Sequence, residues 1–349
     1  MPKILYIAPH LSSFVKNDIL ILEEENTVLK DIRDWSKKLN TPLLILKQLF
    51  FLLKNIRELD RIIISFGGYW SLFPTLLGKI FGVPTYIIIN GTDAVAFDEI
   101  NYGSLRKTPL KQVIYLSYKL ASRLLPVSKS LMYTKNSYYG KYELEHGVKA
   151  YFNNLKTPYT VIPNGIDFKQ WKLDKIVERS PLSFLTVMGK GQEKVKGIEL
   201  FVELATSFPN CTFSIAGVDS ISFSTPDNVH CLGRKTQTEL TEIYYQNLFY
   251  LQLSNFEGFG VSLCESMYCG CIPIVSKVNA LPEIIGNSGF VIERRDVRTA
   301  IYVVETAIET VSSGRYSNSS RQRIVENYSI QHRNNEFVEL LKIKKKESK

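Results

Sequence analysis

The 349-residue sequence lacks the features that would mark a disulfide scaffold, a zinc site or a membrane span. Its five cysteines have a spacing that fits neither paired disulfides nor four zinc ligands. No apolar run reaches the roughly 18 residues that a membrane-spanning helix needs. The first ten residues hold one lysine and no long apolar core, so we expect no cleaved signal peptide. We therefore expect a cytoplasmic protein with reduced thiols.

Acidic residues are scarce in the first half of the chain. Through Gln170 there are 22 Lys and Arg against 14 Asp and Glu, or +8, whereas the remainder has 21 against 20, or +1. A basic half could meet an anionic membrane surface or an acidic substrate, or it could serve solubility. Charge alone motivates nucleic-acid binding, and we expect no nucleic-acid partner.

Strand-like apolar runs alternate with helix-like segments along the chain. In the first half "RIIISFGG" is followed by "LFPTLLGKIFG" and then by "TYIIING". In the second half "SFLTVMG", "CTFSIAG", "FYLQLSN" and "CIPIVS" repeat this rhythm. The pattern predicts an α/β fold with parallel sheets. The Tyr-rich polar stretch that follows "RLLPVS" is predicted to be helical.

A polar, turn-rich segment from Pro163 to Pro181 separates two apolar strands and predicts a domain boundary. We expect a doubly wound, Rossmann-like domain over residues 1–165 and a second over residues 166–325. Residues 326–349 are predicted to form a helix with a basic tail that packs back on the first domain. Ligands of such sheets bind at the carboxyl ends of the strands, which places the expected site in the cleft between the domains.

The stretch "SNFEGFGVSLCES" holds two acidic residues, Glu257 and Glu265, on either side of a Gly-Phe-Gly turn. The turn and the following helix, predicted to begin near Val261, offer free backbone N–H groups and a partial positive charge to an anion. A carboxylate accepts hydrogen bonds from vicinal hydroxyls. A ribose and a hexose at the two acids, with a diphosphate between them, would explain the pattern. Two solvated surface acids would not explain the glycines.

Other strands of the second half also end in glycine and cations. "TVMGKGQEKVKG" carries Gly189, Lys190 and Lys196, and it matches neither a dinucleotide fingerprint nor a Walker loop. Small residues and lysines after a parallel strand suit a diphosphate, although a solvated loop remains an alternative. Gly217 and Arg234 follow the next two strand-like runs, where a base or ribose could lie against the backbone.

The segment "EGFGVSLCESMYCGCIPIVSKVNALPEIIG" resembles the signature of retaining glycosyltransferase family 4, which has the GT-B fold. "VIPNGIDFKQW", "VMGKGQEKVKGIELFVELA" and "CLGRKTQTEL" support the resemblance in the same order. It implies transfer of a hexose from a nucleoside-diphosphate sugar to an acceptor hydroxyl with retained configuration. The second domain would bind the donor and the first the acceptor.

The resemblance also implies roles for individual residues. Glu257, Lys190 and Lys196 would be catalytic, with Glu257 at the hexose and the lysines at the diphosphate. Glu265 would bind the donor ribose. The other substrate-binding residues would be Asn90, Asp93, Gly189, Gly217, Arg234, Gly258, Phe259, Gly260, Val261, Ser262 and Leu263. We expect no cofactor and no metal, because the lysines and the helix terminus can stabilise the leaving diphosphate and no Asp-x-Asp pair is present.

Two departures from the family pattern leave alternatives open. Asn90 stands where the family usually has a histidine, and His10, Ser12 and Ser13 stand where it has a glycine pair. The first motivates a sugar-nucleotide-binding protein without catalysis. A nucleotide-sugar epimerase or phosphorylase of the same fold is a further alternative.

The acceptor is the part that the sequence indicates least, and the oligomeric state is not indicated. A glycan or a lipid-linked acceptor would suit polysaccharide or glycolipid synthesis. The segment "LLILKQLFFLLKNIRELDR" is predicted to place Lys47, Lys54, Arg57 and Arg61 on one face of a helix, which suits peripheral contact with an anionic membrane. We favour the simpler interpretation, a helix that packs its apolar side into the core and leaves a basic edge in water.

Overall fold

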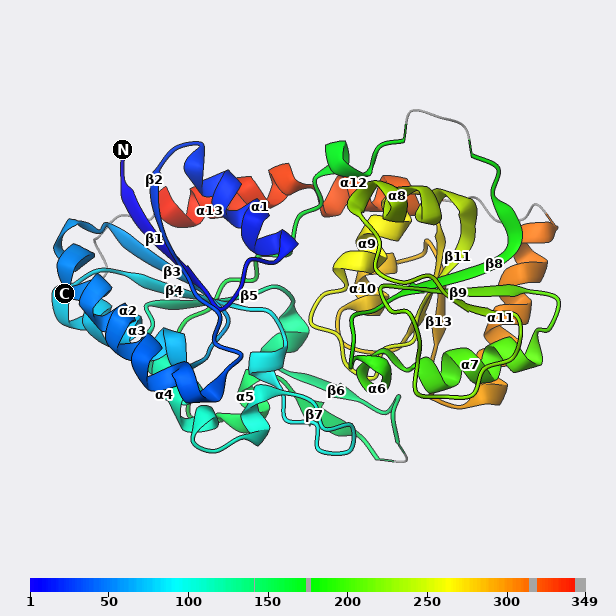
Figure 1. Ribbon diagram of the computed structural model, residues 1–349, viewed down its shortest axis with the longest axis horizontal. Helices are drawn as coiled ribbons and strands as arrows, with labels where there is room; N and C mark the ends of the chain where they lie inside the picture. The colour runs from blue at the N-terminus through cyan, green and yellow to red at the C-terminus, as the bar shows by residue number, and fades with distance from the viewer. Residues whose placement is uncertain (141, 174–176, 314–318, 343–349) are drawn as a thin grey trace. The chain divides into compact units, whose positions relative to one another are not determined.

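The computed structural model describes residues 1–140, 142–173, 177–313 and 319–342. These residues form two compact units. The first comprises Met1–Thr134, Glu145–Gly165 and the described residues from Gln331 onward. The second comprises Lys135–Leu144 and Ile166–Ile330, and each unit is built on its own parallel sheet (Figure 1).

The sheet of the first unit has five parallel strands in the order β2-β1-β3-β4-β5. They are β1 (Lys3–Ala8), β2 (Thr27–Ile32), β3 (Arg61–Ser65), β4 (Thr85–Ile89) and β5 (Arg123–Pro126). Strand β4 is buried along its whole length, as expected for a strand covered on both faces. The helices are α1 (Ser13–Glu23), α2 (Thr41–Asn55), α3 (Tyr69–Phe81), α4 (Leu110–Leu120) and α5 (Val148–Tyr151).

The sheet of the second unit has six parallel strands in the order β10-β9-β8-β11-β12-β13. They are β8 (Ser180–Val187), β9 (Thr212–Ala216), β10 (Val229–Cys231), β11 (Asn247–Gln252), β12 (Ile272–Ser276) and β13 (Phe290–Ile292). Counted within the unit, this is the 3-2-1-4-5-6 order of nucleotide-binding α/β folds. The strand order reverses between β8 and β11, which is where such sheets bind ligands.

The helices of the second unit begin and end at recognisable signals. Thr236 and Glu239 form a capping box at the start of α8, and Asp296 caps α11. The helices are α6 (Glu193–Lys196), α7 (Ile198–Ser207), α8 (Gln237–Gln246), α9 (Val261–Tyr268), α10 (Leu281–Ile285), α11 (Val297–Ser312) and α12 (Ser320–Asn327).

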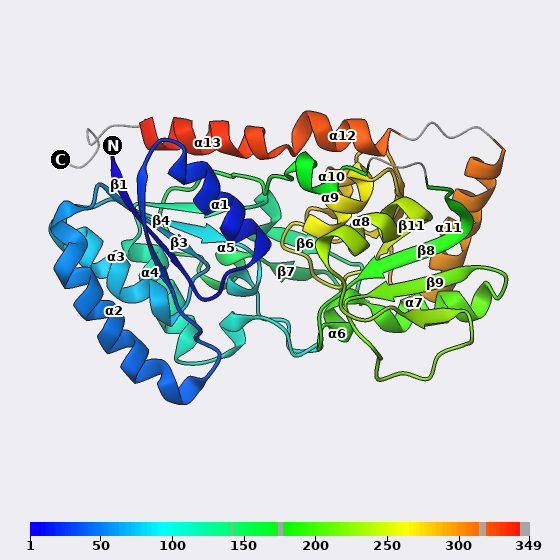
Figure 2. The ribbon, with the colours of Figure 1, turned by 45° about the horizontal axis from the view of Figure 1, so that its top comes forward.

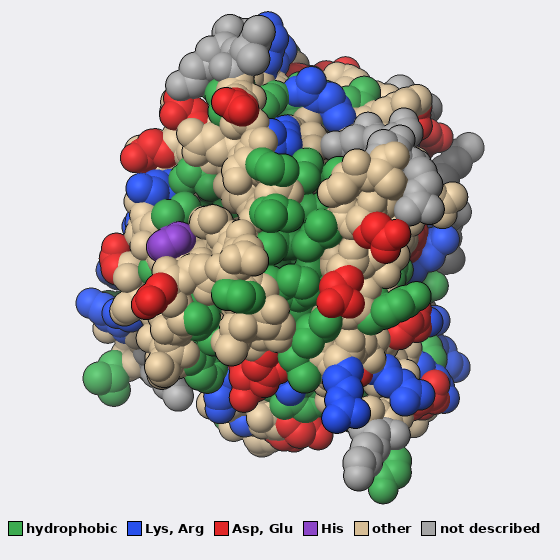
Figure 3. All heavy atoms as spheres, turned by 90° about the vertical axis from the view of Figure 1, so that its right-hand side faces the viewer, with side chains coloured by type: hydrophobic (Ala, Val, Ile, Leu, Met, Phe, Trp, Pro, Cys, Tyr) green, Lys and Arg blue, Asp and Glu red, His purple; other side chains and the backbone are tan. Residues whose placement is uncertain are grey.

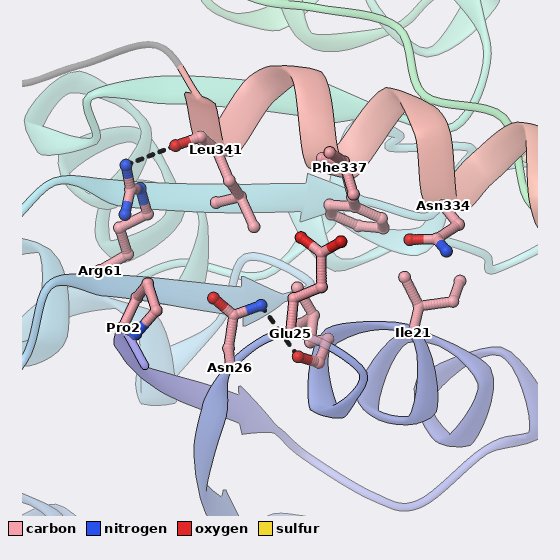
Figure 4. A pocket seen from close by; sticks show the side chains of 10 residues that line it. Pro2, Ile21, Glu25, Asn26, Arg61, Asn334, Phe337 and Leu341 are labelled. Carbon is pink, nitrogen blue, oxygen red and sulfur yellow. Dashed lines mark hydrogen bonds between the residues drawn. The ribbon is translucent and has the colours of Figure 1, made fainter.

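The last described helix, α13 (Ile330–Lys342), packs on the first unit from Gln331 onward (Figures 2 and 4). Its Arg333 makes a buried ion pair with Asp18 of α1 at 2.7 Å and donates to the backbone oxygen of Ile162 at 2.9 Å. Figure 4 shows the side of α13 that carries Phe337 facing α1, with a pocket of about 210 Å³ beside it. Arg61 closes this pocket by donating to the Leu341 carbonyl at 2.5 Å.

Two predictions about local structure are wrong. The Tyr-rich stretch is not a helix, because its described residues form the paired strands β6 (Thr134–Asn136) and β7 (Leu144–His146). Arg61 does not share a helix face with Lys47 and Lys54, because α2 ends at Asn55 and Arg61 opens β3. The basic tail beyond Lys342 lies outside the described residues.

Candidate active site

The loops after β8 and β11 carry most of the predicted site residues. Both follow the two strands between which the strand order of the second unit reverses. The β8 loop leads into α6 and contributes Lys196, and the β11 loop contributes Glu257. The two loops are tied by backbone contacts, since the Asn255 N–H donates to the Val195 carbonyl at 2.8 Å.

The Glu257 carboxylate is the centre of a small polar network. Its Oε2 atom accepts a hydrogen bond from Lys196 Nζ at 2.8 Å, and about 14% of the lysine side chain and 16% of the glutamate side chain are exposed. Gln252 Nε2 at 2.8 Å and Ser254 Oγ at 3.3 Å donate to the same oxygen. One carboxylate oxygen is thus fixed by three donors, which sets the orientation of the whole group.

Gly197 explains why Lys196 comes so close to Glu257. It ends α6 in the left-handed region at φ +66°, and a Cβ atom there would lie 2.0 Å from the Leu253 carbonyl oxygen. A side chain at this position would therefore push the β8 and β11 loops apart. At Gly197 the backbones of the two loops therefore approach closely, and the Lys196 ammonium group lies beside this contact.

The ends of β8, β9 and β10 are also joined through glycine. Gly217 has φ +105°, and a Cβ atom there would lie 2.1 Å from the Met188 carbonyl oxygen. Its N–H donates to the Gly233 carbonyl at 2.9 Å. Gly189 differs, since its N–H donates to Gln192 Oε1 at 2.9 Å and an added Cβ would meet only ordinary contacts. Lys190 and Arg234 are exposed beside these strand ends.

The glycine turn after Glu257 leads directly into α9, which begins at Val261 as predicted. Gly260 precedes the helix at φ +103° with no side-chain cap on the first turn. The N–H groups of Val261, Ser262 and Leu263 therefore stand at the start of the helix, where backbone donors have no intrahelical partner. The Phe259 and Leu263 side chains are buried, and Phe259 packs edge-on against Tyr328 with ring centroids 5.6 Å apart. Both residues can meet a ligand only through their backbone.

Glu265 lies on α9 in surroundings very different from those of Glu257. Its Oε2 atom accepts a hydrogen bond from the Tyr244 hydroxyl at 3.3 Å. Burial raises the pKa of Glu265 to about 7, and the tyrosine bond only partly offsets this effect. A carboxyl group of this kind is half ionised near neutral pH, so that hydroxyl ligands which favour the ionised form would shift its protonation.

In the first unit, Asp93 is a structural residue. It is fully buried, and its Oδ2 atom accepts from the Gly67 N–H at 2.8 Å and from the Tyr118 hydroxyl at 2.9 Å. Its Oδ1 atom accepts from the Asn90 and Gly91 N–H groups at 3.2 and 3.1 Å. Burial raises the pKa of Asp93. The carboxylate thus holds the loops after β3 and β4, and its contact with a substrate stays a prediction.

Asn90 begins the loop that follows β4. Its Nδ2 atom donates to Ser65 Oγ at 3.2 Å and to the Ile88 carbonyl at 3.4 Å, while its Oδ1 atom is buried and has no hydrogen-bond partner among the described residues. The side chain is thus oriented by β3 and β4. In the loop after β1, Ser12 caps α1 by accepting from the Val15 N–H at 3.4 Å, and His10 is exposed.

Sequence reasoning missed the residues that hold the two acids. Gln252 and Ser254 bind Glu257, and Tyr244 binds Glu265. The one available signal was a glutamine and a serine in the otherwise apolar run "FYLQLS". Asn279 was also missed: it accepts from the Glu257 N–H at 3.4 Å and has φ +49°, which is unusual for a residue other than glycine.

Within the described ranges, no group of three or more His, Cys, Asp or Glu side chains is placed to hold a metal ion. The five cysteines are free thiols. Burial raises the pKa of Cys271, which lies near α9, to about 11, so this thiol stays protonated at neutral pH.

Two parallel α/β sheets with this arrangement of strands define the GT-B glycosyltransferase fold. Sucrose-phosphate synthase from Thermosynechococcus elongatus superimposes with a TM-score of 0.72 at 12% identity, over 98% of both chains. Anabaena HepE in complex with UDP and glucose superimposes with a TM-score of 0.70 at 16% identity, over 98% of this chain and 99% of that chain. At such identities the likeness shows the fold alone.

The family is defined by the second unit. Residues 171–328, which include the Glu257 loop and α9, match the family described as glycosyl transferases group 1. A relative from Campylobacter jejuni subsp. jejuni serotype O:2, N,N'-diacetylbacillosaminyl-diphospho-undecaprenol alpha-1,3-N-acetylgalactosaminyltransferase, is 21% identical over 292 residues. This match covers 78% of the chain and 76% of the relative. Residues 171–328 therefore match the glycosyl transferase group 1 family, and the two sheets have the fold of GT-B glycosyltransferases.

Proposed function

We propose that this protein is a glycosyltransferase that moves a hexose-type sugar from a nucleoside-diphosphate sugar to an acceptor hydroxyl, with retention of the anomeric configuration. The observation that carries the proposal is the Glu257 network. A carboxylate fixed by Lys196 stands directly before a glycine turn and the free N–H groups of α9. Hydroxyls, a diphosphate and backbone donors would find complementary partners along this short stretch.

Each residue then has a role that the geometry supports. Glu257 accepts hydrogen bonds from hydroxyls of the transferred hexose, and Glu265 accepts them from the ribose. Lys190 and Lys196 neutralise the departing diphosphate, so that the reaction needs no metal ion to stabilise the leaving group. The backbone of Gly258, Phe259, Gly260, Val261, Ser262 and Leu263 meets sugar and phosphate, whereas Gly189, Gly217 and Arg234 lie on the nucleotide side. Asn90 is proposed as a sugar contact from the motif resemblance alone, with Asp93 as the residue that positions it.

The acceptor that we propose is a lipid-linked sugar or glycan. The Campylobacter jejuni relative is named for transfer to a diphospho-undecaprenol carrier. The same class of acceptor fits the basic first half of this chain, because diphosphate carriers and their bilayers are anionic. We place the reaction at the cytoplasmic face of a membrane, in polysaccharide or glycolipid synthesis.

A thermal-shift panel with UDP, ADP, GDP and their hexose derivatives tests the donor. A true donor at 100 times its dissociation constant should add roughly 2.7 kcal/mol to the free energy of unfolding. The stabilising nucleotide sugar is then incubated with a polyprenyl-diphosphate sugar, and the products are separated and their linkage determined. Stabilisation without transfer to any acceptor would favour a binding protein, and conversion of the free donor would favour an epimerase. No response to any nucleotide would refute the proposal.

A further inference from the structure

Helix α2 of the first unit exposes large apolar side chains. Phe50 is 74% exposed, Leu46 is 63% exposed, and Leu43 and Leu53 are each 53% exposed. Leu39, which lies just before the helix, is 96% exposed. These five residues follow one another at steps of four and three, so they form a single stripe along one side of the helix. We call this stripe the α2 face.

The opposite side of α2 provides the contact with the rest of the unit. There Gln48 and Leu52 are buried, and α2 packs against α3. The interpretation of α2 as a helix that packs its apolar side into the core is therefore wrong for the four of its nine Leu, Ile and Phe residues that are exposed. Helix α3 adds the exposed Ile80 and Phe81 at its C-terminal end, beside the exposed Lys79. Exposed apolar surface of this extent marks a site that another molecule covers.

Between the exposed acidic residues Asp34 and Glu58, the charges of the α2 segment are all of one sign. From Trp35 to Arg57 the sequence has five Lys and Arg and no Asp or Glu. Lys47 and Lys54 are exposed, lie seven residues apart and each follow a leucine of the stripe. Two helical turns therefore present apolar side chains with ammonium groups along one edge. This combination of apolar and basic side chains complements a partner that has an apolar interior and negatively charged groups at its surface.

A second copy of the chain would be a poor partner for this face. The four-three spacing alone would suit a helix pair, but paired helices place flanking charges of opposite sign against each other. Two copies of α2 would bring lysines together with no acidic residue between Trp35 and Arg57 to meet them. The repulsion that this causes disfavours self-association, whereas anionic lipid headgroups supply the missing negative charge.

We propose that the α2 face is the surface by which this protein lies on a bilayer that contains anionic lipid. The stripe enters the boundary between headgroups and acyl chains, and Lys47 and Lys54 bind the headgroup phosphates. In the described part of the chain, no helix has the length and hydropathy to cross a bilayer. The proposal deepens the proposed function, on which it rests for its purpose, because it brings a lipid-linked acceptor within reach of the enzyme.

Vesicle flotation with the full chain tests the proposal. Vesicles of phosphatidylcholine alone are compared with vesicles that also contain phosphatidylglycerol, at low salt and at about 1 M salt, where the Debye length is about 3 Å. The protein should float with the anionic vesicles at low salt and be largely released at high salt. Lys47→Gln with Lys54→Gln should weaken binding roughly 25-fold, at about fivefold for each basic residue. Leu46→Ser with Phe50→Ser should weaken it by about 10- to 100-fold.

Matched controls come from exposed positions of the second unit. Tyr302→Ser removes an aromatic side chain that is 70% exposed, and Lys169→Gln with Arg298→Gln removes two exposed cations. Both controls should float like the unchanged protein. Circular dichroism and thermal unfolding verify that every variant is folded, which is expected because each change is at an exposed side chain.

The outcomes separate this proposal from the proposed function. Undiminished flotation of both α2 variants, or equal losses in the controls, would overturn the α2 face as the lipid-binding surface. Absence of flotation together with a dimer that Phe50→Ser dissociates in sedimentation would overturn it in favour of self-association. Nucleotide-sugar binding is measured in the same variants without lipid. If the unchanged protein binds no nucleotide sugar, the proposed function fails while the flotation result still decides the role of α2.

Discussion

Proteins usually bury apolar side chains and expose charged ones. The surroundings of Glu257 bury charged groups, whereas the outer side of α2 exposes apolar ones. Around Glu257, the second unit largely buries a lysine and a carboxylate together with a glutamine and a serine. Along α2, the first unit leaves a phenylalanine and several leucines in water. Ion pairs taken out of water and apolar stripes left in water both cost stability compared with the ordinary arrangement. Each is therefore evidence for a molecule that binds there.

Helix α11 shows what an ordinary surface helix of this protein looks like. It buries Ala300, Val304 and Ala307 and turns Arg298, Tyr302, Glu305 and Glu309 outward. On the face that includes α11, basic and acidic side chains are interspersed (Figure 3). Neither description fits α2, which exposes its apolar residues and has cations alone. Because α11 has an ordinary polar surface, the exposed apolar residues of α2 are not a general property of the surface helices of this protein.

If the ion pair at Glu257 serves the reaction rather than the fold, Lys196→Ala should have the largest effect on catalysis of the changes that we consider. Loss of one preorganised charge at the leaving diphosphate should lower kcat/KM by about 10²- to 10³-fold, or roughly 3–4 kcal/mol of transition-state stabilisation. The free energy of unfolding should fall by less, because Glu257 keeps its bonds to Gln252 and Ser254. Steady-state kinetics and urea unfolding measure the two quantities.

Lys194→Ala is the matched control, since its side chain is exposed two residues earlier in the same short helix, α6. It should retain most of the activity. Equal losses in both variants would mean that general positive charge, rather than the contact with Glu257, matters in this loop.

The protonation of Glu265 should make the stability of the ligand-free protein depend on pH. Its pKa is about 7 in the folded protein, against 4.5 for an unperturbed glutamate, so the folded state holds a proton that the unfolded state has lost between these values. Stability should therefore be greatest below pH 4.5 and fall as pH rises to 7, by about 3 kcal/mol at 1.4 kcal/mol for each pKa unit. Glu265→Gln should remove this loss. Urea unfolding of both proteins from pH 4.5 to 8 measures it, and parallel pH profiles would contradict the assignment.

Replacement of Gly197 should lower the stability by more than its left-handed backbone conformation alone explains, because the backbone of Leu253 lies so close. Gly191 has φ +77° with nothing within 4 Å of an added Cβ, whereas Gly197 has φ +66° with a carbonyl oxygen at 2.0 Å. Gly191→Ala should cost about 1 kcal/mol of stability, and Gly197→Ala about 2–4 kcal/mol, because only the second must move the β11 loop. Comparable losses in denaturant unfolding would show that the loop moves freely and that Gly197 does not position Lys196.

Nucleotide binding should be linked to the same proton at Glu265. Ribose hydroxyls favour the ionised carboxylate, so the affinity for the nucleoside diphosphate should weaken by up to about tenfold for each pH unit below 7. Glu265→Ala should weaken binding by about 1–3 kcal/mol at pH 8. Calorimetry in buffers of different ionisation enthalpy should detect a released proton. An affinity that is independent of pH and unchanged in the variant would exclude a ribose contact.

The order of elements and the core of the candidate site could be predicted from the sequence because their signals are local. Apolar runs such as "TYIIING" and the Gly-Phe-Gly turn are each contained in a few adjacent residues. The partners of the acids could not be predicted in this way. Tyr244 meets Glu265 across 21 residues of sequence, and Lys196 meets Glu257 across 61, so their contacts depend on how distant elements pack.

The role of α2 shows a different limit of sequence reasoning. Its sequence, "TPLLILKQLFFLLKN", is apolar on nearly every side, and a pattern without a clear polar face does not tell which side packs inward. The buried side is known only from the structure, where Gln48 donates to Asp31 at 3.1 Å and is more buried than Phe50. A polar residue inside and an aromatic residue outside is the reverse of what hydropathy alone predicts.

The smallest expected effect gives the sharpest test of that reversal. Phe50 and Leu52 lie two residues apart in α2, yet Phe50 is 74% exposed and Leu52 is fully buried. In the absence of lipid, Phe50→Ser should change the free energy of unfolding by less than about 0.5 kcal/mol, as at other exposed positions. Leu52→Ser should cost about 3–5 kcal/mol, because it removes core packing and buries a hydroxyl. Denaturant unfolding of both variants measures the difference, and a large loss in Phe50→Ser would mean that the α2 face is packed against protein in solution. With anionic vesicles present the ranking should change, since Phe50→Ser then loses lipid binding while any folded Leu52→Ser protein keeps an intact stripe.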